Sequence, residues 1–452
     1  MLPEPIRQAI DVASNFVWGP WTLALLLGTG VFLTVRLRFV QVLRFRDGLR
    51  AMIPAQASGA GTLSPFQAFM TALGASIGTG NIAGVATAIV SGGPGALFWI
   101  WVYGFFATAI KFTEAVLGIQ YRQVTGERLS AGPMHYLRAG IGSPKLAWLY
   151  ALIAGVAALT TTPFTQPNSM AVVLQSQFSI PPLASGVLIA VLTWLVVIGG
   201  VKSIGRAAER LAPLKVGLYL VGGLIVILTH AAQLPSVFAL ILREAFSLEA
   251  AGGGAAGVGM MAAMRYGIAR GIYANEAGYG TAAVAYGTAR TEAPVQQGLQ
   301  AVMEVFIVSF VTSTISALVI LASGAWTSGL TSTAVVAQAF NTAIPTVGGW
   351  IVAFCAFLFG YTTLIGWAYY GEQFLEYAVG LRVTKPYRWV YCGLIVFGAM
   401  GKVETIWAWG DLMNGLQVFP NLVGLIGLSG VAASMLRQSR ARPADTVTPP
   451  VL

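Results

Sequence analysis

Long apolar runs alternate along the chain with short polar segments. A transmembrane helix needs about 20 mostly apolar residues, and the sequence contains roughly eleven runs near that length. The pattern therefore predicts an all-α polytopic membrane protein. The predicted spans are Val17–Val35, Pro65–Val90, Ala96–Gln120, Leu146–Val173, Leu183–Val201, Leu211–Leu228, Val258–Tyr286, Leu299–Leu321, Trp350–Tyr377, Trp389–Met400 and Leu412–Met435.

Composition excludes a soluble protein. The chain is 56% hydrophobic and 9% charged, with a mean hydropathy of +0.74, whereas soluble domains carry roughly 25% charged residues. The net charge of +10 does not indicate a nucleic-acid partner, because the charges are sparse and lie between apolar runs. Neither His135 nor His230 stands in a catalytic context, so we do not expect an enzyme. Nor do the spans carry the continuous polar stripe of a channel.

Basic residues orient the predicted spans. Most of the 26 basic residues fall in alternate loops on one side, and Lys and Arg gather on the cytoplasmic side of bacterial-type membrane proteins. We therefore expect a plasma or inner membrane protein with its N-terminus outside and its C-terminus in the cytoplasm. The residues assigned to the inner side are Arg36, Arg38, Arg44, Arg46, Arg50, Arg122, Arg128, Arg138, Lys145, Lys202, Arg206, Arg210, Lys215, Arg290, Arg382, Lys385, Arg388, Arg437, Arg440 and Arg442.

Two segments five spans apart resemble each other. Residues 81–88 and 275–282 are identical at five of eight positions, and helices five apart cross the membrane in opposite directions. This is the pattern of an inverted-topology repeat, although chance matching in an Ala- and Gly-rich chain remains an alternative. The predicted division is 1–50 (extra helix and basic cytoplasmic loop), 51–230 (first repeat), 231–436 (extracellular segment and second repeat) and 437–452 (disordered cytoplasmic tail).

The second span contains a glycine-rich, polar segment that predicts a broken helix. Gly74, Gly78 and Gly80 lie among Ser, Thr and Asn residues, and the segment 271–275 occupies the matching place in the second half. Loosened backbone in a membrane survives around a ligand or inside a bundle. Such breaks near the midplane suit a carboxylate at the helix N-terminus and a hard cation at free carbonyls. Close helix packing through small residues is the alternative for the glycines.

Three further polar positions within spans are candidates for ligand contacts. Thr362 and Thr363 offer adjacent hydroxyls, although span threonines often bond to the carbonyl four residues earlier. Gln166 lies between two prolines and suits either a polar substrate group or a structural hydrogen bond. Trp367, one turn beyond Thr363, is a candidate pocket wall or a packing residue.

Ionisable groups inside spans are costly and are functional candidates by default. Lys111 and Glu114 are three residues apart and can neutralise each other, and Lys111 can also pair with Glu276. We expect these three residues to be gating or scaffold charges. A proton relay through Glu276 is the alternative. Further glutamates within or near span ends are Glu304, Glu372 and Glu376.

The sequence resembles the sodium:alanine symporter family, the alanine-or-glycine:cation symporters, over nearly its whole length. The resemblance implies a leucine-transporter-like fold of ten core helices in two inverted five-helix repeats, with Val17–Val35 as an extra leading helix. It also implies Na⁺-coupled uptake of a small neutral amino acid, alanine or glycine, with no cofactor. The segments that carry the resemblance are GTGNIAGVATAI and GGPGALFWIW within Gly78–Trp101, KFTEAVLGIQYR at Lys111–Arg122, GPMHYL at Gly132–Leu137 and NEAGYGTAAVA at Asn275–Ala285.

The resemblance also implies site residues. The backbone amides of Thr79 and Gly80 would bind the substrate carboxylate, with Asn81 nearby. The other implied substrate contacts are Gln166, Gly271, Ile272, Asn275 and Trp367. The implied Na⁺ ligands are the carbonyls of Gly74 and Ile77 and the hydroxyls of Thr362 and Thr363. A proton-coupled transporter of the same fold that uses Glu276 is the alternative function.

Overall fold

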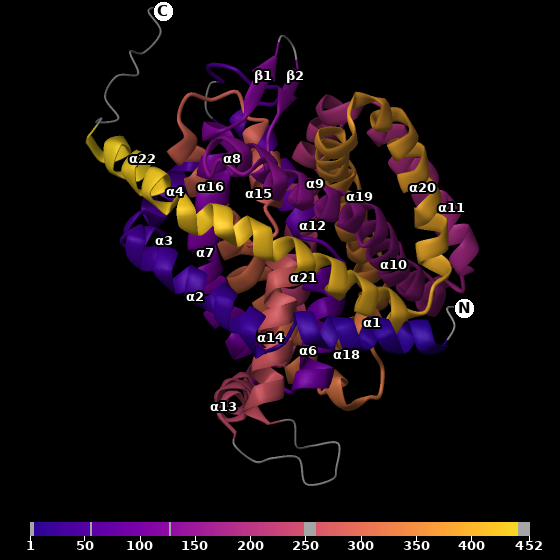
Figure 1. Cartoon of the computed structure of the whole chain (residues 1–452). Coiled ribbons are helices and arrows are strands. Elements are labelled where there is room, and N and C mark those ends of the chain that lie inside the picture. The colour runs from indigo at the N-terminus through magenta and orange to yellow at the C-terminus, as the bar shows by residue number, and fades with distance from the viewer. Residues whose placement is uncertain (1–3, 55–56, 126–127, 248–258, 442–452) are drawn as a thin grey trace, which may run out of the picture.

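The computed structural model describes residues 4–54, 57–125, 128–247 and 259–441. These residues are almost entirely helical, which confirms the predicted all-α class (Figure 1). The strands of the described part form one small antiparallel hairpin, β1 (Gln123–Thr125) and β2 (Arg128–Ser130).

The N-terminal segment forms helices along the outside of the bundle (Figure 1). A kink at Gly19–Pro20 separates the first two helices, since proline starts a helix readily. Helix α1 packs on α21, and α2 packs on α7. The segment comprises α1 (Glu4–Val17), α2 (Pro20–Arg36), α3 (Val40–Leu43) and α4 (Phe45–Ala51), while α21 is Val403–Gly427 and α7 is Ala96–Gln120.

The next helices run to residue 229. Ser64 and Gln67 form a capping box that starts α5 directly before the glycine-rich segment. Pro163 and Pro167 lie in α10. Thr161 separates this helix from the preceding helix, α9. These elements are α5 (Pro65–Ser76), η1 (Thr79–Asn81), α6 (Ala83–Gly92), α7, α8 (Pro133–Ala139), α9 (Pro144–Thr160), α10 (Thr162–Phe178), α11 (Pro182–Val197) and α12 (Gly200–Thr229).

The second half repeats a broken helix and adds a π-helical turn, η3. Helix α18 was not expected, because its sequence is too short and too polar for a span. The elements are η2 (Ala231–Gln233), α13 (Leu234–Ala245), α14 (Met260–Asn275), α15 (Thr281–Gly287), α16 (Pro294–Val305), η3 (Phe306–Thr312), α17 (Ser313–Ala322), η4 (Ala325–Thr327), α18 (Ser332–Ala343), α19 (Val347–Val379), η5 (Leu381–Val383), α20 (Thr384–Met400), α21 and α22 (Ser429–Ala441).

The described helices fit a multi-pass membrane protein. Six are long and apolar enough to cross a bilayer, or up to eight if each bent pair counts as one span. Shorter helices such as α11, α14 and α20 account for other predicted runs. The total of eleven spans and the division into two repeats therefore stay predictions. Apolar side chains on α11, α12 and α20 face outward, as expected beside lipid, and include Leu188, Leu195, Leu214, Val221 and Phe397.

Two long helices, α7 and α19, form the centre of the bundle. Helix α19 contacts α5, α9, α10, α12 and α18, and α7 contacts α14, α15 and α16. Each broken helix thus lies against one long unbroken helix. The two broken helices also contact each other, α6 against α14 and α5 against α15, and these contacts fix the two breaks relative to each other.

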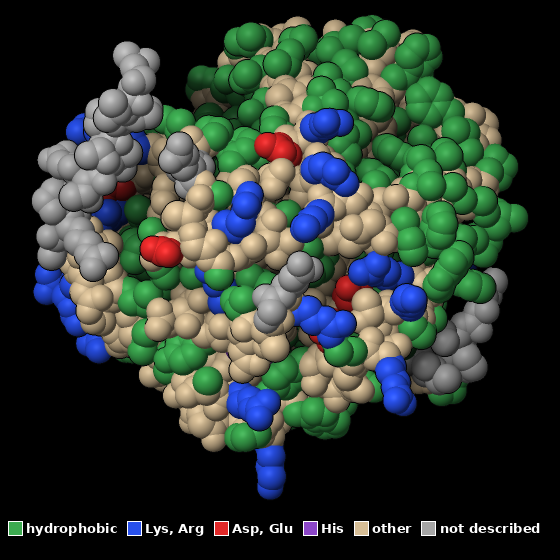
Figure 2. All heavy atoms as spheres, turned by 90° about the horizontal axis from the view of Figure 1, so that it is seen from above, with side chains coloured by type: hydrophobic (Ala, Val, Ile, Leu, Met, Phe, Trp, Pro, Cys, Tyr) green, Lys and Arg blue, Asp and Glu red, His purple; other side chains and the backbone are tan. Residues whose placement is uncertain are grey.

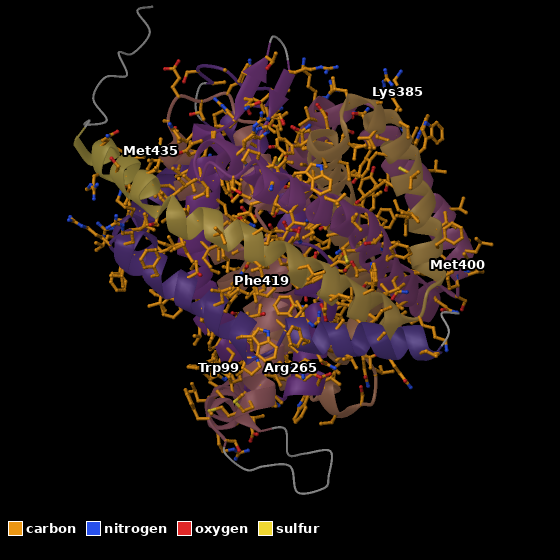
Figure 3. The ribbon with its side chains drawn as sticks, in the orientation of Figure 1. Trp99, Arg265, Lys385, Met400, Phe419 and Met435 are labelled. Atoms are coloured by element: carbon orange, nitrogen blue, oxygen red, sulfur yellow. The ribbon has the colours of Figure 1, made fainter. Side chains whose placement is uncertain are left out.

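Lys and Arg side chains gather on the face that carries β1 and β2 (Figure 2). A surface groove there is lined by Arg128, Lys202, Lys385 and Arg388 among others. Lys385 and Met400 mark the two ends of α20, with Lys385 at this face (Figure 3). The clustering agrees with the charge pattern from which the cytoplasmic side is predicted.

Two details of the sequence interpretation are wrong. Lys215, counted among the loop residues, is fully buried inside α12, because the polar stretch before it continues the same helix. The tail predicted from residue 437 is helical as far as Ala441, since α22 extends to that residue. Residues 442–452 of the predicted tail lie outside the described residues.

Candidate functional site

The first break separates α5 from α6 and confirms the predicted interruption. The two helical segments meet at an angle of 56°. Glycine is required here by close approach: a Cβ at Gly78 would lie 2.6 Å from the Thr363 hydroxyl, and one at Gly80 would lie 2.7 Å from the Tyr273 ring. The glycines therefore serve the contact between the break and its neighbours and not only helix packing.

The second break lies a few residues later than predicted. Helix α14 stays regular through Gly271 and Ile272 and ends at Asn275. The interruption follows at Glu276, Gly278 and Gly280, all with positive φ, a conformation that glycine adopts at no steric cost. The expected break at 271–275 is therefore wrong. The backbone turns where the later glycines allow it.

A small cavity of about 10 Å³ lies between the two breaks. Three of the predicted substrate residues line it, namely Gly80, Gln166 and Trp367. None of the other lining residues is among the predicted substrate contacts. The complete lining is Ala75, Ser76, Gly78, Gly80, Thr161, Thr162, Gln166, Tyr273, Glu276, Tyr279, Thr363, Trp367 and Asn414.

Gln166 joins the first break to α10. Its side-chain oxygen accepts hydrogen bonds from both the backbone N–H and the hydroxyl of Thr79, each at 2.9 Å. These two donors at the start of η1 are thus directed at a carbonyl-type oxygen. A carboxylate oxygen can accept the same hydrogen bonds.

The two asparagines of the repeated segments anchor both breaks to one element. The Asn81 amide donates to the Val308 carbonyl at 3.3 Å, and the Asn275 amide donates to the Ser309 hydroxyl at 3.1 Å. Both acceptors lie in η3, and π-helical turns are frequent at functional sites. Asn81, Asn275, Gly271, Ile272 and Thr79 are absent from the cavity lining among the described residues.

Glu276 places a carboxylate on the cavity wall. One of its oxygens accepts from the Trp367 indole at 2.6 Å and the other from the Thr281 hydroxyl at 2.8 Å. The side chain is 4% exposed. In the part of the chain that the structure describes, none of the ion pairs within 4 Å includes Glu276. A carboxyl group therefore faces the cavity with no basic side chain within 4 Å among the described residues.

Lys111 binds a different carboxylate from those expected. Its ammonium lies 2.7 Å from Glu304 and 2.9 Å from the Ser76 hydroxyl, and it also donates to the Asn275 carbonyl. The predicted pairing with Glu114 is wrong, as is the alternative pairing with Glu276. Because Ser76 ends α5 and Asn275 ends α14, Lys111 ties the ends of both broken helices to α16.

Glu114 binds backbone amides in the second break. One carboxylate oxygen accepts from the N–H groups of Gly278 and Gly280, at 2.9 and 3.1 Å, and from the Asn421 amide at 2.8 Å. A carboxylate near the N-terminus of α15 is also favoured by the helix dipole. Glu114 therefore fixes the backbone of the break.

The oxygens predicted to bind Na⁺ come together, with the Lys215 ammonium among them. Lys215 donates to the carbonyls of Gly74, at 2.9 Å, and Ile77, and to the Thr362 hydroxyl. The Thr363 hydroxyl donates to the Ala75 carbonyl at 2.7 Å. The sequence interpretation missed this lysine because it assigned Lys215 to a loop.

A second layer covers the cavity beyond Tyr273. The Tyr273 hydroxyl donates to Thr165 at 2.6 Å, and its ring lies 4.9 Å from that of Trp407. Arg270 lies over Trp407 and forms a two-pronged ion pair with Asp411. The pair connects α14 with α21.

Comparisons with known proteins agree on the class. Residues 4–449 match the sodium:alanine symporter family. The sodium/alanine symporter AgcS of Methanococcus maripaludis is 38% identical over 94% of this chain and 95% of its own. The probable sodium/glutamine symporter GlnT of Bacillus subtilis is 34% identical over 96% and 91%.

The fold also matches a solved transporter. A manganese transporter of Eremococcus coleocola, solved with an aromatic bis-isothiourea compound, aligns with a TM-score of 0.56. The alignment has 16% sequence identity and covers 85% of this chain and 88% of that one. The architecture is thus that of the leucine-transporter fold, which confirms the predicted fold class.

Proposed function

The chain belongs to the sodium:alanine symporter family, and from this membership we propose that it carries a small neutral amino acid into the cell by Na⁺-coupled symport. Secondary transport follows from the family and the fold. The substrate and the coupling ion are the proposed part. Alanine and glycine are the proposed substrates, and the similarity to the sodium/alanine symporter AgcS supports this choice.

One observation carries the proposal: the cavity lies between two helix ends of opposite polarity. Thr79 and Gly80 lie at the start of the helix that follows the first break, where N–H groups without a partner inside the helix favour an anion. The C-terminus of α14 and the Glu276 carboxylate lie at the second break and favour a cation. A zwitterion matches both sides at once.

Each group has a proposed role. The substrate carboxylate takes the hydrogen bonds of Thr79 that Gln166 now accepts, and the substrate ammonium binds Glu276. Tyr273 and Trp367 enclose the substrate side chain. The cavity has a volume of only about 10 Å³, roughly the room of one water molecule, so it must widen to admit a substrate and a small side chain requires the least widening.

Alternating access then requires the broken helices to move relative to the scaffold. Lys111 and Glu114 bridge both breaks to neighbouring helices and are the proposed charges whose contacts change during gating. The face rich in Lys and Arg is proposed to be cytoplasmic, with the N-terminus outside and the protein in the inner membrane.

A proton-coupled transporter is the second candidate. Two observations favour it: Glu276 faces the cavity without a basic partner among the described residues, and Lys215 occupies oxygens predicted for Na⁺. A proton carried by Glu276 would replace Na⁺ as the driving ion.

Uptake into proteoliposomes separates the candidates. Radiolabelled alanine and glycine are offered under an inward Na⁺ gradient, an inward H⁺ gradient, or neither, with unlabelled glutamine as a competitor. The proposal predicts concentrative uptake with the Na⁺ gradient alone. Concentration driven only by H⁺ would establish the second candidate, and uptake that merely equilibrates would contradict both.

A further inference from the structure

Every N–H donor of the Lys215 ammonium has a hydrogen-bond acceptor. It has three N–H donors, and three oxygens accept them: the carbonyls of Gly74 and Ile77 and the hydroxyl of Thr362. The side chain is fully buried, and the ring of Phe359 lies 5.2 Å from the nitrogen, within the range of a cation–π contact.

The position of these oxygens explains why they hold a cation. Gly74 lies in the last turn of α5, and Ile77 follows the end of that helix. Carbonyls at a helix C-terminus lack partners within the helix and carry partial negative charge. Lys215 comes from α12 and Thr362 from α19, so the ammonium connects three helices at the first break.

A sodium ion cannot share this position. It would need the same three oxygens and the space between them, which the lysine nitrogen already fills. The lysine nitrogen is covalently tethered, so it remains near the oxygens at every Na⁺ concentration.

We propose that the Lys215 ammonium is the resident cation of the cluster formed by Gly74, Ile77 and Thr362, in place of Na⁺. It pins the end of α5 to α12 and α19. This inference rests on the proposed function, because it states where the coupling ion does not bind. A sodium ion that drives transport takes other oxygens, and Lys215 acts as a positioning residue for the broken helix.

The test measures the effect of Na⁺ on the melting temperature of the purified full-length protein. Bound Na⁺ stabilises the folded state in proportion to its occupancy. Melting curves are recorded in rising NaCl, with choline chloride holding the ionic strength constant. The variants are Thr362→Val, Lys215→Met and the double variant. Lys202→Met is the control, because Lys202 is exposed on the same helix, α12.

Two results are expected. Thr362→Val keeps the same Na⁺ response as the parent, because Na⁺ does not bind that hydroxyl. Lys215→Met frees the oxygens and gains a saturable Na⁺-dependent rise of a few degrees beyond the parent response, and adding Thr362→Val removes that gain. A lysine with only a packing role would produce no such Na⁺-specific gain.

Two results would overturn the inference. One is that the Thr362→Val variant loses the Na⁺ response of the parent protein. This variant keeps Lys215, so the result is informative even if the Lys215→Met variant does not fold. The other is a folded Lys215→Met protein with the parent response. Failure of the proposed function shows separately, as absent Na⁺-driven alanine uptake by the unmodified protein.

Discussion

The buried ion pair between Lys111 and Glu304 offers a quantitative test of how the two breaks are held. The side chains are 1% and 0% exposed, and their charged atoms lie 2.7 Å apart. Replacing Lys111 by Met leaves the Glu304 carboxylate buried with only neutral donors, Ser76 and Tyr286.

The expected cost follows from the burial of both charges. Breaking a buried pair by removing one partner destabilises a protein by about 3–5 kcal/mol, whereas replacing both partners by uncharged groups is often nearly neutral. Lys111→Met and Glu304→Gln should therefore each be strongly destabilising. The double variant should lose far less than the sum of the two single losses, so the coupling free energy should be at least about 3 kcal/mol.

The assay is denaturant unfolding in detergent micelles, followed by tryptophan fluorescence, on the parent, both single variants and the double variant. The control is the surface pair of Arg243, which is exposed, and Glu244, which is half-buried; their charged atoms are 3.0 Å apart, and their coupling should stay below about 1 kcal/mol. Additive effects of the Lys111 and Glu304 substitutions would refute the argument.

Three further predictions concern the cavity and one nearby histidine. Glu276→Gln should raise the KM for alanine roughly 10- to 150-fold, the effect of losing a charged hydrogen bond worth about 1.5–3 kcal/mol; unchanged uptake kinetics would exclude the ammonium contact. Gly78→Ala, whose Cβ would meet the Thr363 hydroxyl, should abolish uptake, while Gly217→Ala, where nothing lies within 4 Å, should not. His135 lies outside the candidate spans. Its burial, and to a lesser extent the nearby charge of Arg138, lower its pKa to about 4. Because the unfolded chain then binds a proton that the folded protein does not, the free energy of unfolding should fall by roughly 3 kcal/mol between pH 6.5 and 4. His135→Gln should flatten that decline in unfolding measurements, and an identical decline would contradict the assignment.

The helical class and the first break could be predicted because their causes are local. Apolar runs near span length predict helices, and a cluster such as Gly74, Gly78 and Gly80 loosens one. The second break was misplaced because positive φ at Gly278 and Gly280 is set by packing against Glu114, a residue far away in sequence.

The partners of the buried charges could not be predicted from spacing. Lys111 and Glu114 are neighbours on one helix, yet each finds a better partner elsewhere: Glu304 for the lysine and backbone amides for the glutamate. Local spacing identifies possible pairs, whereas tertiary packing selects among them. The contacts of Lys215 could not be predicted either. The polar stretch before it resembles a loop in sequence but forms part of helix α12, which places the ammonium at the end of α5.

The most direct test of the account is the binding of alanine, propionate and ethylamine to the purified protein in NaCl, measured by calorimetry. Propionate lacks the ammonium group, and ethylamine lacks the carboxylate. If the cavity holds a zwitterion between the first break and Glu276, alanine should bind at least tenfold more tightly than either analogue, since each charged hydrogen bond is worth about 1.5–3 kcal/mol. Glu276→Gln should reduce the advantage of alanine over propionate. Propionate binding as tight as alanine binding would contradict the proposed site.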